Sequence, residues 1–574
     1  MGNNELTVRV AGEAGQGMQT VGTVLCDIFR KEGFDLFSNQ DYMSRIRGGN
    51  NYFQIRVSSH PLQSHREKTD ILVALDRESV SLHRKDLCKE GVLVADGKKF
   101  NLEVHDGAFF DVPLYQIALD KGGSEIYVNS VSCGLIAGLI KLDFAAVERQ
   151  LRLTFSNKKE DVINKNILAA KTGYEYATSN FRDVSFKLTP GHSKREMMMN
   201  GNDAIALGAI KAGCKFYSAY PMTPSTSILN VVSHFAKDFN ILVEQAEDEI
   251  AAINMAIGAS FAGVRAMTGT SGGGFALMVE GLSLAAMTET PVVIVDAQRP
   301  APATGFPTRT EQSDLNFLIH AGHGEFARAI YAPGTIEQAF YLTIKAFNLA
   351  EKYQIPVLIM TDQHLADSTR NIELIRQDAV KVRRSIISKE ESANVTNYLR
   401  YRLTKSGISP RAIPSWIEDV IYVDSDEHTE EGHITEEGTI RNRMVEKRLY
   451  KKMQGLSREI EKPSFDVREA KTVLIGFGST YGVMKEVCEE TKGKVGFVHL
   501  SQVWPFPSVE MKKLLMKKRR MLTLENNAGA QLAQLLRRET GIEVNDSILK
   551  YDGRPFSLDE VLIRLSQRTK RKQR

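Results

Sequence analysis

The chain has 574 residues, of which 42% are hydrophobic and 25% are charged, and its formal net charge is +4. A chain of this length is too long for one hydrophobic core and is expected to form about three to four domains. The small net charge points to no particular partner, and we expect no nucleic acid among them. No apolar run approaches the roughly 20 residues that span a bilayer, and the N-terminus has no apolar signal region, so we expect a cytoplasmic protein without a membrane partner.

Cysteine usage argues against a metal centre in this chain. The cysteines lie far apart in the sequence, and no two of them form a CxxC pair. An iron–sulfur cluster or a structural zinc ion normally has about four ligands in close pairs, so we expect neither here. Scattered cysteines in a reducing compartment are most simply core residues, and we interpret all of them in this way: Cys26, Cys88, Cys133, Cys214 and Cys488.

The N-terminal stretch begins an α/β domain. Residues 6–35 read as a short alternating strand, a glycine-rich turn and an amphipathic helix. Strand-like runs follow at 52–58, 70–75 and 91–96. Residues 188–202 mix turn formers with charge and are typical of a linker.

The turn AGEAGQG places Gly12, Gly15 and Gly17 between the first strand and the first helix. Glycines in this place let the backbone approach a ligand closely, and a helix N-terminus favours phosphate. The spacing is not the dinucleotide pattern GxGxxG, so a tight turn without a ligand remains equally open. The basic stretch MSRIRGGNN adds Arg45 and Arg47, and together the two loops favour an anionic ligand.

From residue 202 the alternation of helices and strands starts again. Helices are expected at 226–237 and 249–261, and an uninterrupted apolar strand at 291–297. Apolar, β-branched runs between helices are typical of a parallel sheet that is buried on both faces. The glycine-rich passage 268–278 is interpreted as a turn where helix and sheet approach closely, and the domain is expected to end near residue 363.

Residues 370–465 carry much charge and little apolar periodicity, which indicates a surface-hugging connection. A third α/β domain follows, with strands expected at 473–477, 495–500 and 520–524. Its loop GFGSTYG lacks the lysine of the phosphate-binding pattern GxxxxGK[ST], so we assign it no nucleotide. The basic tail at 564–574 is interpreted as a solvated, frayed terminus.

Three acidic residues stand at the start of a helix made of small and apolar residues. Glu247 and Asp248 fit the ordinary role of carboxylates that complement the helix dipole. Glu249 is followed by AAINMAIG, so it is expected at a buried helix start. A charge in such a place is costly unless a cationic or protonated group meets it.

The stretch EIAAINMAIG, with Gly258 nine positions after Glu249, resembles the pyrimidine-binding domain of thiamine diphosphate enzymes. YPMTPST resembles the YPITPS loop of the 2-oxoacid:ferredoxin oxidoreductases, and residues 269–315 resemble the α-subunit of that family. Residues 1–180 resemble its γ-subunit, fused ahead of α. The C-terminal motifs GFGSTYG, VWPFP and LENNAGAQL resemble the transketolase C-terminal-like domain, so the resemblance covers nearly the whole chain.

The resemblance implies an α/β fold with three α/β domains, including a thiamine-diphosphate-enzyme pyrimidine-binding fold and a transketolase C-terminal-like domain. The expected boundaries are 1–185 for the γ-type domain and 200–370 for the pyrimidine-binding domain. Residues 371–465 would be the charged connection, and residues 466–574 the transketolase C-terminal-like domain.

The resemblance also assigns roles to individual residues. Glu249 corresponds to the catalytic glutamate that hydrogen-bonds N1′ of the aminopyrimidine and favours the tautomer that removes the thiazolium C2 proton. Thr223 corresponds to the loop threonine whose hydroxyl meets the substrate, with Pro221 beside it at the cofactor. Arg299 corresponds to the arginine that pairs with the 2-oxoacid carboxylate, which suits a planar bidentate donor. A surface arginine after a strand is the alternative reading of Arg299.

Thiamine enzymes hold Mg²⁺ and the diphosphate with a GDG motif, and this chain has none. Because CxxC pairs are also absent, the resemblance implies that the Mg²⁺ and diphosphate site and a [4Fe-4S] cluster lie on a β-subunit partner. The implied assembly contains two αβ pairs and passes electrons to ferredoxin. Coenzyme A is the implied co-substrate, and the family's γ domain lies over its site, so we expect contacts from the loops with Gly12, Gly15, Gly17 and Arg47.

The implied function is that of the α-subunit, with fused γ domain, of a 2-oxoacid:ferredoxin oxidoreductase that forms acyl-coenzyme A and CO₂. The fused arrangement and the stretch SDEHTEEGHITEE look most like the 2-oxoglutarate enzymes, while pyruvate and branched-chain 2-oxoacids stay open. One rival is a non-catalytic module that binds nucleotide or coenzyme A and regulates a partner. Another is a transketolase-like enzyme complete in one chain, against which the missing diphosphate motif argues.

Overall fold

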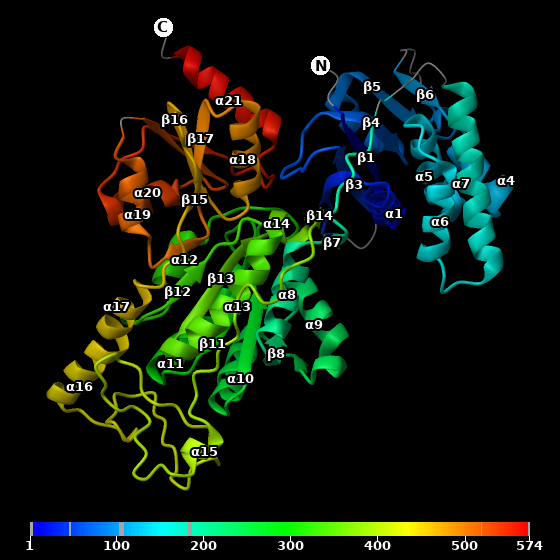
Figure 1. The fold of residues 1–574 in the computed structure, drawn as a ribbon. Helices are drawn as coiled ribbons and strands as arrows, with labels where there is room; N and C mark the ends of the chain where they lie inside the picture. Colours follow the sequence, from blue (N-terminus) through cyan, green and yellow to red (C-terminus); the bar gives the residue numbers. More distant parts are fainter. Residues whose placement is uncertain are drawn as a thin grey trace. The chain divides into compact units, whose positions relative to one another are not determined.

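The computed structural model describes residues 4–44, 48–102, 108–181, 186, 188–517 and 519–571. The chain divides into two compact units (Figure 1). Unit 1 comprises Met1–Met199, Ser368–Ile375 and Ser557–Arg574, and unit 2 comprises Asn200–Asp367 and Arg376–Phe556. Within the described ranges, no helix is both long and apolar enough to cross a membrane.

Unit 1 is built on a mixed sheet that is antiparallel from its first strand to one edge and parallel from that strand to the other edge. In the parallel part, the first strand of the chain pairs with the strand expected near 70, which in turn pairs with the strand expected near 91. The strand order is β6 (Phe109–Asp111), β5 (Leu87–Ala95), β4 (Thr69–Ala74), β1 (Glu5–Ala14), β3 (Gly48–Ser58), β2 (Asp35–Asp41), β14 (Thr369–Ile372) and β7 (Met197–Met199).

The helices of unit 1 cover this sheet and pack on one another. The tightest pair is α5 (Val128–Leu139) with α7 (Glu160–Asn180), because a Cβ at Gly134 would collide with the Ala170 carbonyl and one at Gly173 with the Val131 carbonyl. The other helices are α1 (Met18–Lys31), α2 (Arg77–His83), α3 (Gly97–Phe100), α4 (Leu114–Gly122), α6 (Phe144–Thr154) and α21 (Leu558–Arg571).

Two expectations about unit 1 are wrong. The stretch interpreted as a linker contains the edge strand β7, whose pairing partner β14 lies far away in the sequence. Residues 564–571 of the basic tail are helical instead of frayed, because they continue α21, whose Leu558, Val561 and Leu565 recur at helical spacing and are buried. Of the cysteines, Cys88 is half-buried, while the other four are buried as expected.

Unit 2 contains the parallel sheet predicted from residue 202 onward. Its strand order is β18 (Gln502–Trp504), β12 (Ala329–Tyr331), β13 (Pro356–Asp362), β11 (Val292–Gln298), β10 (Arg265–Thr270), β8 (Cys214–Ala219) and β9 (Leu242–Gln245). All neighbouring strands are parallel except β18, which pairs antiparallel with β12. The inner faces of α10 (Glu249–Phe261) and α11 (Gly272–Met287) share one apolar core with β11. The remaining helices are α8 (Gly201–Lys211), α9 (Thr226–Phe239), α12 (Leu315–His320), α13 (Ile336–Tyr353) and α14 (Gln363–Asp367).

The third sheet also belongs to unit 2, and three of its five strands lie where the sequence predicts them, at 473–477, 495–500 and 520–524. Its order is β15 (Ser464–Asp466), β17 (Val495–Leu500), β16 (Thr472–Phe477), β19 (Arg520–Glu525) and β20 (Asp546–Leu549). The helices α18 (Thr480–Glu490), α19 (Ser508–Leu515) and α20 (Gln531–Thr540) pack with it. Residues of α11, β11, β16 and α20 belong to one continuous core, so the two sheets of unit 2 support each other.

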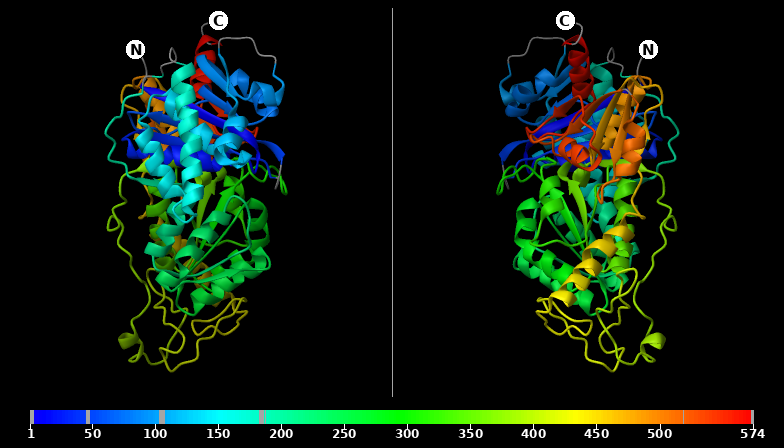
Figure 2. Two further views of the ribbon diagram at one scale, coloured as in Figure 1. Left: turned by 90° about the vertical axis from the view of Figure 1, so that its right-hand side faces the viewer. Right: turned by 90° about the vertical axis from the view of Figure 1, so that its left-hand side faces the viewer.

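The charged connection is largely irregular, but buried ion pairs fix it to unit 2. It carries the short helix α15 (Lys389–Ser392) and ends in α16 (Gly438–Val445), a π-helical turn (Glu446–Lys451) and α17 (Lys452–Leu456). Figures 1 and 2 show it at the end of the β11 sheet that lies away from the third sheet. There the fully buried Glu289 pairs with Lys447 and, at 2.5 Å, with Lys452.

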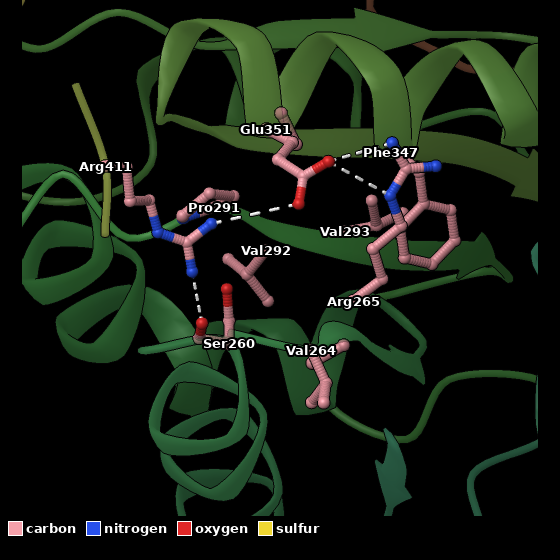
Figure 3. A pocket seen from close by; sticks show the side chains of 11 residues that line it. Ser260, Val264, Arg265, Pro291, Val292, Val293, Phe347, Glu351 and Arg411 are labelled. Carbon is pink, nitrogen blue, oxygen red and sulfur yellow. Dashed lines mark hydrogen bonds and ion pairs between the residues drawn. The ribbon is translucent and has the colours of Figure 1, made fainter. Parts of the chain in front are cut away.

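A second buried anchor is Glu351 on α13 (Figure 3). Arg265 donates to its carboxylate at 2.9 Å, Arg384 of the connection donates at 2.9 Å, and Arg411 lies 3.9 Å away. The cavity among these side chains measures about 10 Å³, which is the room of about one water molecule. This cluster therefore ties the connection down and leaves no space for a ligand of substrate size.

Candidate active site

The loop after β8 carries the YPMTP motif and is held from a neighbouring helix. Asn202, in the first turn of α8, donates from Nδ2 to the Pro224 carbonyl at 2.7 Å. The peptide bond between Thr223 and Pro224 is cis. Pro221 and Thr223 are half-buried on this turn. The loop lies at the carboxyl end of a parallel strand, which is where open α/β sheets bind ligands.

Arg299 directly follows β11 and reaches the same loop. Its side chain is 8% exposed, and Nη1 donates to the Thr223 carbonyl at 2.8 Å. Burial lowers the pKa of the guanidinium, while the nearby carboxyl groups of Asp314 and Glu249 act in the opposite direction. Thr223, Arg299 and Glu249 therefore lie in one place, and Arg299 is not the surface arginine of the alternative reading.

Glu249 is the first residue of α10 and turns away from solvent. It is 3% exposed, and its Oε1 has no hydrogen-bond partner among the described residues. Asp248 is the N-cap, because its side chain accepts from the Ala251 amide at 2.7 Å, and Glu247 is exposed. The three acidic residues thus differ in role, since only one of them presents an unpaired oxygen to the interior.

The first turn of α11 has no side chains where it faces this carboxylate. A Cβ at Gly274 would collide with Glu249 Oε1 and with Thr270 Oγ1. One at Gly272 would collide with the carboxylate of Asp314, whereas at Gly273 the nearest atom would be 3.6 Å away. The glycine-rich passage was predicted as a close approach of helix and sheet, and its close neighbours are carboxyl groups.

Two buried carboxyl groups near Arg299 were missed by the sequence analysis. Asp296 lies within β11 and is 0% exposed, and Asp314 lies before α12 and is 7% exposed. Burial, and then the neighbouring Asp314, raises the pKa of Asp296 well above its usual range. Burial together with Glu311 raises the pKa of Asp314 to about 7, which Arg299 counteracts. An acidic residue inside the otherwise apolar strand VVIVDA was a signal available in the sequence.

The N-terminal glycine turn lies in unit 1, between β1 and α1. A Cβ at Gly12 would collide with Gln16 Oε1, and one at Gly17 with Asn129 Nδ2, so packing within the turn and against α5 accounts for these two glycines. Gly15 has φ +94° and open space where a side chain would stand. Arg45 and Arg47 lie outside the described residues.

Three family models match the chain in succession. The model described as "Pyruvate ferredoxin/flavodoxin oxidoreductase" matches residues 7–176. The model described as "Pyruvate flavodoxin/ferredoxin oxidoreductase, thiamine diP-bdg" matches residues 207–447, and therefore includes the loop after β8, Glu249 and Arg299. The model described as "Pyruvate:ferredoxin oxidoreductase core domain II" matches residues 470–561.

Full-length relatives are similar to the chain over nearly its whole length. A 2-oxoacid:ferredoxin oxidoreductase subunit alpha of Sulfolobus sp. is 34% identical, over 96% of this chain and 95% of its own. The 2-oxoglutarate oxidoreductase subunit KorA of Mycobacterium tuberculosis is 29% identical, over 97% of this chain and 90% of its own.

One solved structure is similar in fold over nearly the whole chain. It is the 2-oxoglutarate:ferredoxin oxidoreductase from Magnetococcus marinus with 2-oxoglutarate, coenzyme A and succinyl-CoA bound, and it superposes with a TM-score of 0.91 at 30% identity. The similarity covers 98% of this chain and 99% of the other.

Proposed function

The chain belongs to the family of 2-oxoacid:ferredoxin oxidoreductase alpha subunits, and from this premise we propose that Thr223, Glu249 and Arg299 are its share of a 2-oxoacid decarboxylation site. The observation that carries the proposal is the unpartnered Oε1 of the buried Glu249, beside a glycine that leaves room for no side chain. A buried carboxylate oxygen needs a donor, and in this place the donor comes from a ligand.

The residues fit the pyrimidine end of thiamine diphosphate. Glu249 would accept a hydrogen bond from a protonated ring nitrogen, and Gly274 would let the ring lie close to the carboxylate. When bound, thiamine diphosphate supplies the carbanion chemistry that decarboxylates a 2-oxoacid. The chain's contribution is to hold a proton at Glu249 Oε1 and so to set the protonation state of the ring.

Arg299 and Thr223 are proposed to hold the substrate. The planar guanidinium suits a carboxylate, and Arg299 is already oriented by its bond to the Thr223 carbonyl. That bond uses the backbone oxygen of Thr223 and leaves its hydroxyl available to the 2-oxoacid. The low exposure of Arg299 strengthens its interaction with a carboxylate, because little water competes with it.

The outer faces of α10 and α11 support a partner subunit. Ile250, Met255 and Leu277 are 49%, 41% and 49% exposed, and at Gly258 an added Cβ would meet open space. Helices that are apolar all round are normally buried, so another chain is expected to cover these faces. We propose a β-type subunit that also carries Mg²⁺, the diphosphate site and a [4Fe-4S] cluster, in an assembly of two αβ pairs that reduces ferredoxin.

For the substrates, we propose 2-oxoglutarate and coenzyme A. The relatives named above include enzymes whose names specify 2-oxoglutarate, and one structure contains 2-oxoglutarate and coenzyme A. Pyruvate and branched-chain 2-oxoacids are the alternatives. For coenzyme A we propose contacts from the N-terminal loops, including Gly15, whose surroundings are open, and Arg47.

The test is reconstitution. The chain purified alone should be inactive and colourless, and should oxidise 2-oxoacids only when produced together with its partner. Comparison of kcat/KM over a panel should rank 2-oxoglutarate above pyruvate and 2-oxoisovalerate. Activity of the isolated chain would contradict the shared site, while a preference for pyruvate would overturn the substrate and leave the enzyme class intact.

A further inference from the structure

Asp296 and Asp314 form a buried pair of carboxyl groups beside Arg299. Most of the oxygens of this pair accept no hydrogen bond from the described residues. Both oxygens of Asp296 and Oδ2 of Asp314 have no hydrogen-bond partner among the described residues. Gln298 holds the backbone of Asp314, since its Oε1 accepts from the Asp314 amide at 3.0 Å. The carboxyl group of Asp314 lies against the first turn of α11 at Gly272.

The needs of folding do not account for this pair. Asp314 precedes α12, but its side chain does not cap that helix. Asp362, at the end of the adjacent strand β13, shows what a structural aspartate looks like here. It accepts from Ser479 Oγ at 2.5 Å, from the Leu365 amide at 3.0 Å and from Gln312 Nε2 at 3.3 Å.

The pair and Arg299 are linked by charge. Two carboxyl groups in one buried space do not both ionise at neutral pH, so the pair retains about one proton and carries about one negative charge. Arg299 is the cation that interacts with Asp314. Without substrate, the remaining negative charge therefore faces the guanidinium.

The other charged groups around the pair are few. Glu311 is on the same loop and disfavours ionisation of Asp314, and Glu249 reaches Arg299 from α10. The first turn of α11 contributes no acidic residue.

We propose that Asp314, together with Asp296, is a positioning residue that balances the charge of Arg299 in the substrate-free protein and takes up a proton when a carboxylate ligand pairs with that arginine. The inference rests on the proposed function for the identity of the ligand, a 2-oxoacid. The arriving carboxylate replaces the pair as counter-ion, so the pair's remaining charge loses its cation and is neutralised by about one proton from solvent. Binding of the 2-oxoacid is thus coupled to proton uptake.

The experiment compares the pH dependence of kcat/KM for 2-oxoglutarate in the reconstituted complex, for the parent and for Asp314→Asn. In the parent, kcat/KM should fall about tenfold per pH unit above an apparent pKa near neutrality, because the competent state needs the proton. In Asp314→Asn the amide cannot ionise, so the decline should shrink to less than about twofold between pH 6 and 8. Asp296→Asn should flatten the profile as well, which covers the case that the first variant does not fold.

Glu311→Gln is the matched control. It removes the neighbouring charge and keeps the pair, so its pH profile should retain the decline. The decline should begin at slightly lower pH, because Glu311 no longer disfavours ionisation of Asp314. A profile of Asp314→Asn that superimposes on the parent would overturn the inference.

A second measurement separates this inference from the proposed function. Calorimetric titration of oxamate into the complex, in buffers of different ionisation enthalpy, should show uptake of about one proton in the parent and close to none in Asp314→Asn. If the complex oxidises no 2-oxoacid, the proposed function fails while this titration still tests the pair. Oxamate binding without proton uptake in the parent would overturn the inference even in an active enzyme.

Discussion

Arg299 Nη1 donates a hydrogen bond of 2.8 Å to the main-chain carbonyl of Thr223, so the arginine is oriented by the backbone of the loop and not by the side chain of Thr223. This separates the tasks of the two residues. Replacing the threonine side chain leaves the support of Arg299 intact, whereas replacing the arginine removes both the hydrogen bond to the loop and the planar guanidinium.

Arg299→Lys should therefore cost more than Thr223→Val. A lysine has no planar fork and cannot reproduce the bond to the loop together with a bidentate carboxylate pair, so kcat/KM for the 2-oxoacid should drop about a hundredfold. Thr223→Val loses one hydrogen bond and should drop kcat/KM by about tenfold. Steady-state kinetics of the reconstituted variants measures both, and equal losses would contradict the separation of tasks.

Gly274→Ala should abolish function by collision. The added methyl group would overlap Glu249 Oε1 and Thr270 Oγ1, so either the carboxylate or α11 must move. Thiamine diphosphate binding, measured by calorimetry on the reconstituted complex, should weaken at least about tenfold. Gly273→Ala is the matched control in the same helical turn, because its methyl group would lie 3.6 Å from the nearest atom. It should bind the cofactor normally, and equal weakening in both variants would show that the turn responds to any added side chain.

Glu289→Gln should loosen the charged connection. The change leaves Lys447 and Lys452 buried without their counter-ion, which typically costs about 3–5 kcal/mol. Glu459→Gln is the control, since its pair with Lys352 is partly exposed and such pairs contribute about 0–1 kcal/mol. Urea unfolding of the complex gives the difference in free energy of unfolding, and limited proteolysis shows whether residues 376–437 are released. Equal stability of the two variants would mean that the buried cluster does not hold the connection.

The carboxyl pair also predicts how stability depends on pH. The pKa of Asp314 is raised to about 7 from an ordinary value of 3.8, so the folded state binds more protons than the unfolded state between these values. Stability then falls as pH rises from about 4 to about 7. Asp314→Asn removes this contribution, so its Tm relative to the parent should increase between pH 5 and pH 8. A constant difference in Tm across that range would show that Asp314 does not titrate in the folded protein.

The sequence predicted the regular parts of the fold well. The helix expected at 249–261 is α10, and the strand expected at 291–297 lies within one residue of β11, because apolar periodicity is a local property. It could not predict β7 and β14, which are short and pair with each other from distant parts of the chain. Strand pairing of that kind depends on tertiary contacts that no window of sequence contains.

The candidate site shows the same division. The motifs singled out Thr223, Glu249 and Arg299, and the structure adds that they lie together. It also shows why α11 begins with glycines, because a Cβ at Gly272 or Gly274 would collide with a carboxyl group. The lack of hydrogen-bond donors for the carboxyl oxygens of Asp296 and Asp314 could not be predicted from the sequence, since it depends on which groups the fold brings near them.

The last prediction distinguishes the three acidic residues at the start of α10. Glu249→Gln keeps the size of the side chain but cannot hold a proton at Oε1 in the same way, so exchange of the cofactor's C2 proton should slow by about a hundredfold or more in the reconstituted complex. Asp248→Asn retains an N-cap acceptor for the Ala251 amide, and Glu247 is exposed, so Asp248→Asn and Glu247→Gln should both exchange at the parent rate. Deuterium exchange at C2, followed by NMR after acid quench, measures the rate without substrate turnover. Slow exchange in either control together with normal exchange in Glu249→Gln would move the catalytic role to another carboxylate. Normal exchange in all three would mean that the unpartnered Oε1 of Glu249 does not meet the cofactor.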